Sequence, residues 1–354
     1  MRHIRPAAVL GLTAAAFLGL SACSSSGGSS TDSAAAGTTS ASSAGTAVTS
    51  GGGSLNLVAY SVPKPAYDAL SAGFATTAQG KGVSINASYG PSGTQAKNVL
   101  GGQAKADVVN FSTGADMLKL VPSKVATGWD SGATKGIVAD SVVVIVVRPG
   151  NPKHITGWDD LIKSGVKIVT PTPATSGSAK WNILAGYQHV IDNGGTAAQA
   201  EDYVKALYKN IVSRAESGSA ATQQFLNGTG DVLISYEAEA IAARQAGKKL
   251  DYIVPDQTFL IETPAAVTTT ASQAGKDFLA YAESAAGQKI FASKGFRPAL
   301  QGVDAGTVQG ANDPSTPYPQ PKKLDTIADL GGWSVANDKF FGDNGIVTKI
   351  ESAG

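Results

Sequence analysis

The sequence predicts an α/β fold in which a mostly parallel sheet is flanked by helices. Short runs rich in valine, isoleucine and leucine alternate with runs of helical periodicity along residues 55–293, and strands separated by helices pair in parallel. The run at 142–147 contains only valine and isoleucine, which indicates a central strand buried on both faces. The length of 354 residues predicts two domains or one large two-lobed domain.

Each element follows from its local pattern along the chain. The expected strands cover 55–60, 83–88, 107–111, 142–147, 166–169, 231–236, 252–254 and 259–261. Helical periodicity predicts helices at 66–77, 94–100, 114–120, 158–162, 180–192, 198–209, 223–226, 275–284 and 288–293. Residues 301–323 are rich in glycine, proline and aspartate, so they are expected to be irregular.

The N-terminus has the pattern of an export signal. Arg2 and Arg5 precede an apolar stretch at 7–20 that is too short to span a bilayer comfortably, which predicts a cleaved signal peptide at 1–22. The segment Leu-Ser-Ala-Cys at 20–23 resembles the bacterial lipobox, so Cys23 is expected to become the lipidated first residue. The alternative is an ordinary secretory signal with an incidental cysteine. Cys23 is the only cysteine, so no disulfide within the chain is expected.

The stretch after Cys23 has the composition of a linker. Residues 24–53 are serine, glycine, threonine or alanine, with Asp32 and Val48 as the exceptions. A segment so poor in large apolar side chains cannot offset the entropy of ordering. Residues 23–53 are therefore predicted to form a lipid-anchored, disordered tether, which would hold the folded part at the extracytoplasmic face of the cell membrane, periplasmic or cell-surface.

Charge, histidine and cysteine content exclude several function classes. The formal net charge of +1 gives no basic excess of the kind that nucleic-acid binding requires. After the signal only His154 and His189 remain, without metal-ligand spacing, so no metal site is expected. The sequence contains neither a G-x-S-x-G elbow nor a phosphate-binding G-x-x-x-x-G-K-[ST] loop. We therefore predict that the protein is not an enzyme and needs no cofactor.

Three strands run into helix starts built from small residues. These starts are Ser92-Gly93, Ser176-Gly177-Ser178 and Ser217-Gly218-Ser219. A helix start carries free N–H groups and a partial positive charge, so it suits an anion, and ligands collect at the carboxyl ends of parallel strands. The first two starts offer only donors, which favours a fully ionised oxyanion such as sulfate over phosphate, which keeps a proton. Glu216, beside the third start, is the one nearby acceptor.

Several longer motifs resemble the bacterial sulfate-binding proteins of ABC importers, which belong to the periplasmic binding protein superfamily. The similarity extends over about residues 55–298. The motifs that carry it are Gly-Pro-Ser-Gly-Thr-Gln-Ala-Lys at 90–97, Ala-Asp-Val-Val-Asn at 106–110, Val-Arg-Pro-Gly-Asn-Pro-Lys at 147–153 with Trp-Asp-Asp-Leu at 158–161, Thr-Pro-Thr-Pro-Ala-Thr-Ser-Gly-Ser-Ala-Lys-Trp-Asn at 170–182, Gly-Asp-Val-Leu-Ile-Ser-Tyr-Glu-Ala-Glu-Ala at 230–240 and Gly-Phe-Arg-Pro at 295–298.

The resemblance implies two α/β lobes joined by a hinge, which close over one dehydrated sulfate held by neutral groups. Lobe 1 would comprise 54–138 plus 259–330, and lobe 2 would comprise 139–258, with crossings near 139–140 and 257–258. Residues 331–354 would form a C-terminal extension. The implied partners are the anion and the permease subunits of an ABC transporter, and the protein is expected to be a monomer.

The resemblance also implies a set of ligand-binding residues. Ser92 would donate its hydroxyl and its N–H, while Ser176, Gly177 and Ser178 would donate N–H groups from one helix start. Gly218 would give a further N–H.

Three positions depart from the family pattern. Ser219 stands where the family often has an arginine. Tyr236 stands where the family has a tryptophan donor, and Ser61 replaces a first-loop aspartate and would contact the ligand only through its backbone. These departures keep thiosulfate, molybdate and tungstate open as ligands.

Functions from other classes remain alternatives to sulfate binding, and several residues are expected to have structural roles. A lipid-anchored hydrolase and a surface adhesin that uses the tail after Gln301 are the alternatives from other classes. Trp158 and Trp181 are expected to be packing residues, and Asp107 and Asp116 to cap or bridge elements. The sets Asp159/Asp160 and Lys97/Lys180 are expected to be solvated, whereas Glu237 and Glu239 would carry contacts between lobes.

Overall fold

The structure is a computed structural model that describes residues 52–353. The predicted signal peptide at 1–22, the lipidation site Cys23 and nearly all of the tether at 23–53 lie outside the described residues. Within the described part of the chain, none of the helices combines the length and the apolar character that crossing a membrane requires.

The strands belong to one ten-stranded sheet. They are β1 (Gly53–Tyr60), β2 (Val83–Gly90), β3 (Val108–Asn110), β4 (Ile137–Val147), β5 (Ile168–Pro171), β6 (Ile211–Ala215), β7 (Val232–Tyr236), β8 (Asp251–Ile253), β9 (Gln257–Val267) and β10 (Lys323–Asp325).

Most helices up to residue 293 overlap the predicted positions, but α7 was not predicted and α6 begins five residues before the predicted 223–226. Further helices lie near the C-terminus. They are α1 (Lys64–Phe74), α2 (Ser92–Leu100), α3 (Gly114–Leu118), α4 (Gly177–Asp192), α5 (Ala197–Asn210), α6 (Gly218–Leu226), α7 (Glu237–Gln245), α8 (Gln273–Glu283), α9 (Ala285–Ser293), α10 (Gly332–Ala336) and α11 (Ile346–Ala353). Two short 3-10 helices are η1 (Trp158–Ile162) and η2 (Ile327–Leu330), and η3 (Asn337–Phe341) is a short π-helix.

The sheet confirms the α/β prediction and adds an antiparallel centre. The strand order is β2-β1-β3-β9-β4-β7-β5-β6. β1 pairs in parallel with β2 and β3, and β5 pairs in parallel with β6 and β7. β9 is antiparallel to β3 and β4, and β4 is antiparallel to β7. These antiparallel pairs differ from the expected parallel pattern, because local composition does not set the direction of a strand.

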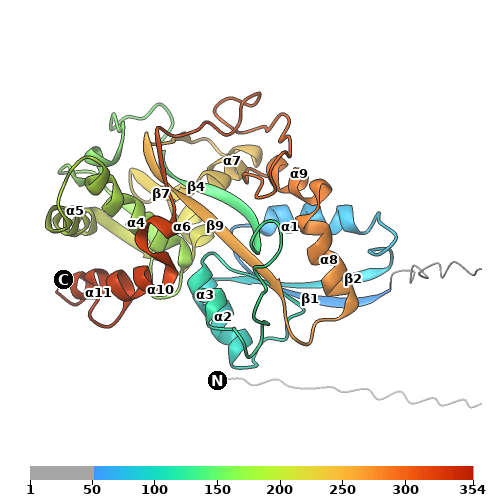
Figure 1. Ribbon diagram of the computed structural model, residues 1–354. Helices are drawn as coiled ribbons and strands as arrows, with labels where there is room; N and C mark the ends of the chain where they lie inside the picture. Colours follow the sequence, from blue (N-terminus) through green and yellow to red (C-terminus); the bar gives the residue numbers. More distant parts are fainter. Residues whose placement is uncertain (1–51, 354) are drawn as a thin grey trace, which may run out of the picture. The chain divides into compact units, whose positions relative to one another are not determined.

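β4 and β9 are the two long strands that join the parallel groups (Figure 1). The first half of β4 pairs with β9, through partners such as Asp140 and Glu262, and its second half pairs with β7. Both predicted lobe crossings fall on these strands. The lobe boundaries themselves stay a prediction.

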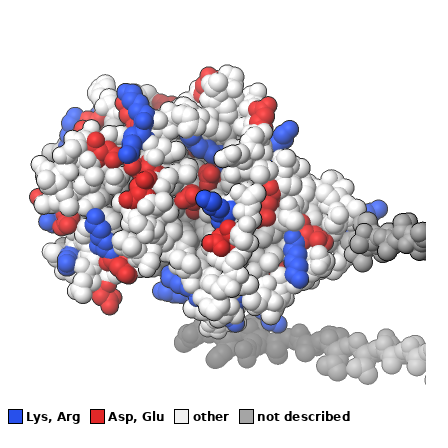
Figure 2. Space-filling view, in the orientation of Figure 1, with Lys and Arg blue, Asp and Glu red and all other residues white. Residues whose placement is uncertain are grey.

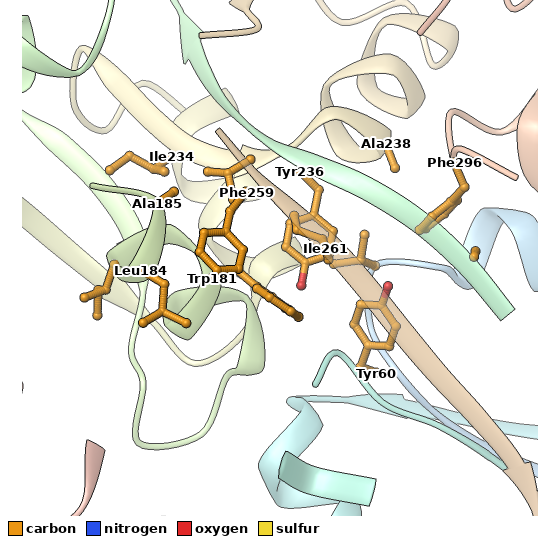
Figure 3. Packing of buried hydrophobic residues seen from close by; sticks show 14 of the residues in the cluster. Tyr60, Trp181, Leu184, Ala185, Ile234, Tyr236, Ala238, Phe259, Ile261 and Phe296 are labelled. Carbon is orange, nitrogen blue, oxygen red and sulfur yellow. The ribbon is translucent and has the colours of Figure 1, made fainter. Parts of the chain in front are cut away.

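Alternating residues of the central strands bury both faces of the sheet. On β4, Val143 and Ile145 pack into one hydrophobic cluster and Val142 and Val144 into another, each fully buried. A strand covered on both faces explains the uninterrupted valine and isoleucine run. Trp181 lies in the first cluster among the side chains of Figure 3, and Trp158 is buried there too. The prediction that both tryptophans are packing residues is confirmed.

The segment after residue 331 packs against α4 rather than extending freely. The rings of Trp333 and Trp181 meet edge to face at 4.6 Å, and those of Phe340 and Tyr187 at 4.8 Å. This cover makes the prediction of a solvated Lys180 wrong: Lys180 is 9% exposed. Its Nζ donates to Asn337 Oδ1 at 2.8 Å, and burial lowers its pKa to about 8. Lys97 is exposed, as predicted.

A buried ion pair holds the Gly-Phe-Arg-Pro motif against the start of α7. Arg297 Nε donates to Glu237 Oε2 at 2.8 Å, and Nη2 donates to Glu237 Oε1 at 3.2 Å. Both side chains are buried. The backbone of Arg297 also pairs with that of Asp140 on β4. The pair therefore ties a segment that follows α9 to the long strand β4 and to α7.

Arg297→Met is expected to destabilise the protein by about 3–5 kcal/mol at neutral pH, because it leaves the Glu237 carboxylate buried without a partner. Burial already raises the pKa of Glu237, and only Arg297 opposes that shift. Without the arginine the folded-state pKa rises further, so the loss of stability shrinks as the pH falls and Glu237 takes up a proton. Urea denaturation at several pH values measures the effect.

Lys289→Met, at an exposed position of α9, is the matched control. It should change stability by less than about 0.5 kcal/mol. An Arg297→Met variant as stable as this control at neutral pH would contradict the assigned role of the ion pair.

Candidate anion-binding site

The start of α4 is buried and uncapped. Ser176 is the N-cap residue, with extended backbone angles, and its side chain makes no capping hydrogen bond. Gly177 and Ser178 form the first turn and are buried. The N–H groups of a first turn have no partner within the helix. The N–H of Ser176 was expected to donate to the anion, but in the structure it already donates to the carbonyl of Thr172 at 3.0 Å.

The start of α2 meets the start of α4 directly. The N–H of Gly93 donates to the carbonyl of Thr175 at 2.9 Å. Ser92 is 1% exposed, and its Oγ donates to Asp116 Oδ2 at 2.7 Å while accepting the N–H of Ser112 at 3.0 Å. The hydroxyl that sequence reasoning assigned to the anion is therefore engaged with a carboxylate. Asp116 bridges elements, as predicted.

The start of α6 lies against the same region. Ser217 caps this helix by accepting the N–H of Ala220 at 3.2 Å. A Cβ added to Gly218 would lie 2.9 Å from Ser178 Oγ and 3.0 Å from Val62 Cγ2. Gly218 therefore touches α4 and also the turn after β1, where the partly exposed Ser61 precedes Val62.

Tyr236 ends β7 with its hydroxyl in this cluster. Its OH lies 2.6 Å from Ser112 Oγ, and its ring centroid lies 6.4 Å from that of Tyr60. Figure 3 shows the two tyrosines reaching toward each other from β7 and β1. Burial raises the pKa of Tyr236 above its ordinary value, so its hydroxyl keeps its proton at neutral pH and stays a donor.

The sequence did not predict the roles of two residues in this cluster, Ser112 and Glu239. Ser112 holds Tyr236 through its hydroxyl and accepts the indole N–H of Trp181 at its carbonyl, at 2.7 Å. Its only sequence signal is its place between a strand and the helix cap Thr113. Glu239 was expected, like Glu237, to carry a contact between lobes. In the structure its Oε2 lies 3.1 Å from the Cβ position of Gly218.

The structure thus brings the three predicted helix starts and Tyr236 into one buried region. Five predicted residues make a hydrogen bond or a close contact within this region: Ser92, Gly177, Ser178, Gly218 and Tyr236. Ser61 and Ser176 make none there, but they are chain neighbours of Val62 and Gly177. Within residues 52–353, no group of three or more His, Cys, Asp or Glu side chains is placed to hold a metal ion. The chemistry on offer is that of uncapped N–H groups and hydroxyls.

One face of the molecule has a mixed charge distribution. On the face in Figure 2, basic and acidic side chains are interspersed, and neither sign covers a continuous area. Oriented dipoles at the helix starts are suited to attract an anion without such a patch.

Comparison with known proteins identifies the family. The profile described as Bacterial extracellular solute-binding protein matches residues 55–297. The chain belongs to this family.

Individual relatives of this solute-binding protein cover most of its length. It is 37% identical over 311 residues to the sulfate-binding protein of Synechococcus elongatus, covering 84% of this chain and 87% of the relative. The thiosulfate-binding protein of Pseudomonas aeruginosa is 30% identical, and the match covers 83% of this chain and 91% of the relative. The solved structure of the sulfate-binding protein SubI from Mycobacterium tuberculosis H37Rv matches with 44% identity and a TM-score of 0.76, over 81% of this chain and 99% of that one.

Gly177→Ala is expected to destabilise this solute-binding protein by about 1–3 kcal/mol through overpacking. The new Cβ would lie 2.6 Å from Ser112 Oγ and 2.9 Å from Thr113 Cγ2, so it must push the segment after β3 away from α4. The hydrogen bond from Trp181 to Ser112 then lengthens. Urea denaturation and the fluorescence of Trp181 measure both effects.

Gly157→Ala is the control, because a Cβ there meets no atom within 4 Å and φ is −179°. If Gly177→Ala matches this control in both stability and fluorescence, the close approach of α4 to Ser112 is wrong.

Proposed function

We propose that this protein captures sulfate outside the cytoplasm and delivers it to an ABC-type importer. The observation that carries the proposal is the convergence of three helix starts and the hydroxyl of Tyr236 in one buried region without a metal cluster. The relatives in Synechococcus elongatus and Mycobacterium tuberculosis are both sulfate-binding proteins, which supports sulfate as the anion. A fully ionised oxyanion accepts hydrogen bonds and needs no acceptor in return.

The proposed ligand contacts follow from the free donors. Gly177, Ser178 and Gly218 supply N–H groups of first helical turns, and Tyr236 supplies its hydroxyl. Hydrogen bonds from such preorganised dipoles replace the hydration of the anion. Ser176 contributes its hydroxyl, because its N–H is already used.

Two further contacts depend on rearrangement or on the backbone. Ser92 contributes its N–H, and its hydroxyl reaches the anion only if it leaves Asp116, where it donates in this structure. Ser61 contributes through its backbone, from the turn that packs beside Gly218.

Hinge closure is the proposed binding motion, with lobe 1 at 54–138 plus 259–330 and lobe 2 at 139–258. Three hydrogen bonds at the candidate site join residues assigned to opposite lobes: Gly93 to Thr175, Ser112 to Tyr236, and Trp181 to Ser112. Opening breaks them, and an anion that touches both lobes favours the closed form. β4 and β9 are the strands on which the lobes would pivot.

The proposal also includes a lipid anchor and a permease partner. Lipid on Cys23 and the tether at 23–53 would hold the protein at the extracytoplasmic face of the membrane, where a monomer could reach the permease. The lipobox-like segment before Cys23 supports this.

Thiosulfate is the second candidate ligand. The thiosulfate-binding relative in Pseudomonas aeruginosa favours it, and Tyr236, in place of the tryptophan that the resemblance implies, is a departure at a ligand contact.

Isothermal titration calorimetry of the purified protein is expected to show one sulfate bound per chain, with no competition from phosphate. The physical reason is that hydrogen phosphate keeps a proton that must find an acceptor, and the two nearest carboxyl groups are engaged, Asp116 with Ser92 and Glu239 with Ser235. Titrations with thiosulfate and molybdate separate the candidate anions. Phosphate binding tighter than sulfate would contradict the proposal.

Tyr236→Phe is expected to weaken sulfate binding by about 10- to 150-fold, which corresponds to the loss of a hydrogen bond to a charged group. Tyr187→Phe is the control, since that buried hydroxyl has no hydrogen-bond partner among the described residues and belongs to the same hydrophobic cluster. Tyr236→Trp tests whether an indole donor restores affinity. Equal affinities for Tyr236→Phe and Tyr187→Phe would remove Tyr236 from the site.

A further inference from the structure

The segment after residue 330 places one tryptophan between two parts of the candidate site. Gly331 and Gly332 have left-handed backbone angles, with φ of 81° and 85°, which glycine adopts without strain. They turn the chain into α10, whose second residue is Trp333. Trp333 is 8% exposed, and its helix contacts α3 (Figure 1). This side chain therefore lies inside the molecule, although its segment is near the end of the chain.

On one side, Trp333 packs against the segment that carries Ser112. A Cβ added to Gly114 would lie 2.7 Å from Trp333 Cδ1 and 3.2 Å from its Nε1, so the indole ring lies directly over the backbone of that glycine. Gly114 is the first residue of α3, and only Thr113 separates it from Ser112. Residues 112–114 are assigned to lobe 1 in the proposed hinge motion.

On its other side, Trp333 packs against α4, which is assigned to lobe 2. Its ring meets that of Trp181 edge to face at 4.6 Å, and the indole N–H of Trp181 donates to the carbonyl of Ser112. The chain after Trp333 is fastened to the same helix, because Lys180 Nζ donates to Asn337 Oδ1 at 2.8 Å. Trp333 therefore moves with α4 if the lobes separate, and its contact with α3 breaks.

The contact between Trp333 and α3 opposes separation of the lobes. An indole ring is one of the largest apolar surfaces that a residue can bury, and opening returns part of it to water, which is unfavourable. The neighbouring indole of Trp181 holds Ser112, and Ser112 in turn holds the hydroxyl of Tyr236. The same contact therefore supports the proposed ligand donor through a chain of direct neighbours.

Building on the proposed capture of sulfate, we propose that Trp333 is a positioning residue that latches the closed form and slows release of the anion. It acts through Trp181 and Ser112 rather than by contact with the anion. The latch joins the segment at 112–114 to α4 only once the lobes have met, after the anion has entered. It therefore changes the rate of release much more than the rate of association.

Gly114→Ala tests the latch from the side of lobe 1. The added Cβ collides with Trp333 in the closed form alone, since the two residues part when the lobes open. Release is followed by rapid filtration of the purified protein loaded with radiolabelled sulfate. It is expected to become about 5- to 150-fold faster, the range that overpacking of a close contact predicts. The rate of association should stay within about twofold of the native rate.

Gly132→Ala is the matched control, because a Cβ there meets no atom within 4 Å and the position is also assigned to lobe 1. It should release sulfate at the native rate. Trp333→Phe has a smaller ring, so it should release sulfate faster than the native protein and leave room for a Cβ at position 114. The double variant with Gly114→Ala should therefore release sulfate no faster than Trp333→Phe alone.

Thermal unfolding with and without sulfate separates a latch from simple packing. A latch makes Gly114→Ala reduce the stabilisation that sulfate confers, whereas a packing contact lowers stability equally in both conditions. Equal release rates for Gly114→Ala and Gly132→Ala, or an equal loss of stability with and without sulfate, overturn the inference and leave the proposed function intact. If Gly114→Ala fails to fold, a native release rate in Trp333→Phe overturns the inference. Absence of sulfate binding to the native protein overturns the proposed function and, with it, this role of Trp333.

Discussion

The uncapped start of a buried helix is the constraint on which the candidate site depends. Backbone N–H groups in a first turn have no partner within their helix, and burying them unpaired is costly. Ser217 meets part of this need at α6 by accepting an N–H. Ser176 makes no such bond at α4, and Pro91, before α2, has no side chain that can. The fold thus concentrates donors where only a ligand or water satisfies them, and the glycines at 177 and 218 allow Ser112 and Ser178 to approach closely.

Closure over such a site requires contacts weak enough to break. The bonds from Gly93 to Thr175, from Ser112 to Tyr236 and from Trp181 to Ser112 are each worth about 0.5–1.5 kcal/mol net. A ligand that binds only the closed form can outweigh a difference of this size. The Arg297–Glu237 pair lies away from the site, at the junction of β4 and α7. Breaking this ion pair would cost much free energy, but it would break only if that junction moved. Strong contacts therefore lie at the junction and weak ones at the site.

The sequence predicted the elements and the donors better than the contacts between them. The three helix starts were found because a strand followed by serine and glycine is a local pattern, and the structure joins them. Ser112, Glu239 and the cover over Lys180 were missed because each depends on residues far along the chain, such as Tyr236, Gly218 and Asn337. The antiparallel placement of β9 was missed for the same reason, since strand direction is set by connections and not by local composition.

The contrast between two glutamates of α7 shows why position decides the behaviour of a carboxyl. Glu237 and Glu239 are both buried within one helical turn, and burial raises the pKa of each. Arg297 opposes the shift at Glu237 through two hydrogen bonds, so charge is retained where it joins elements. Glu239 faces hydroxyls and the start of α6, where an arginine would compete with the helix for the anion. Burial without a counter-charge among the described residues therefore disfavours the ionised form of Glu239.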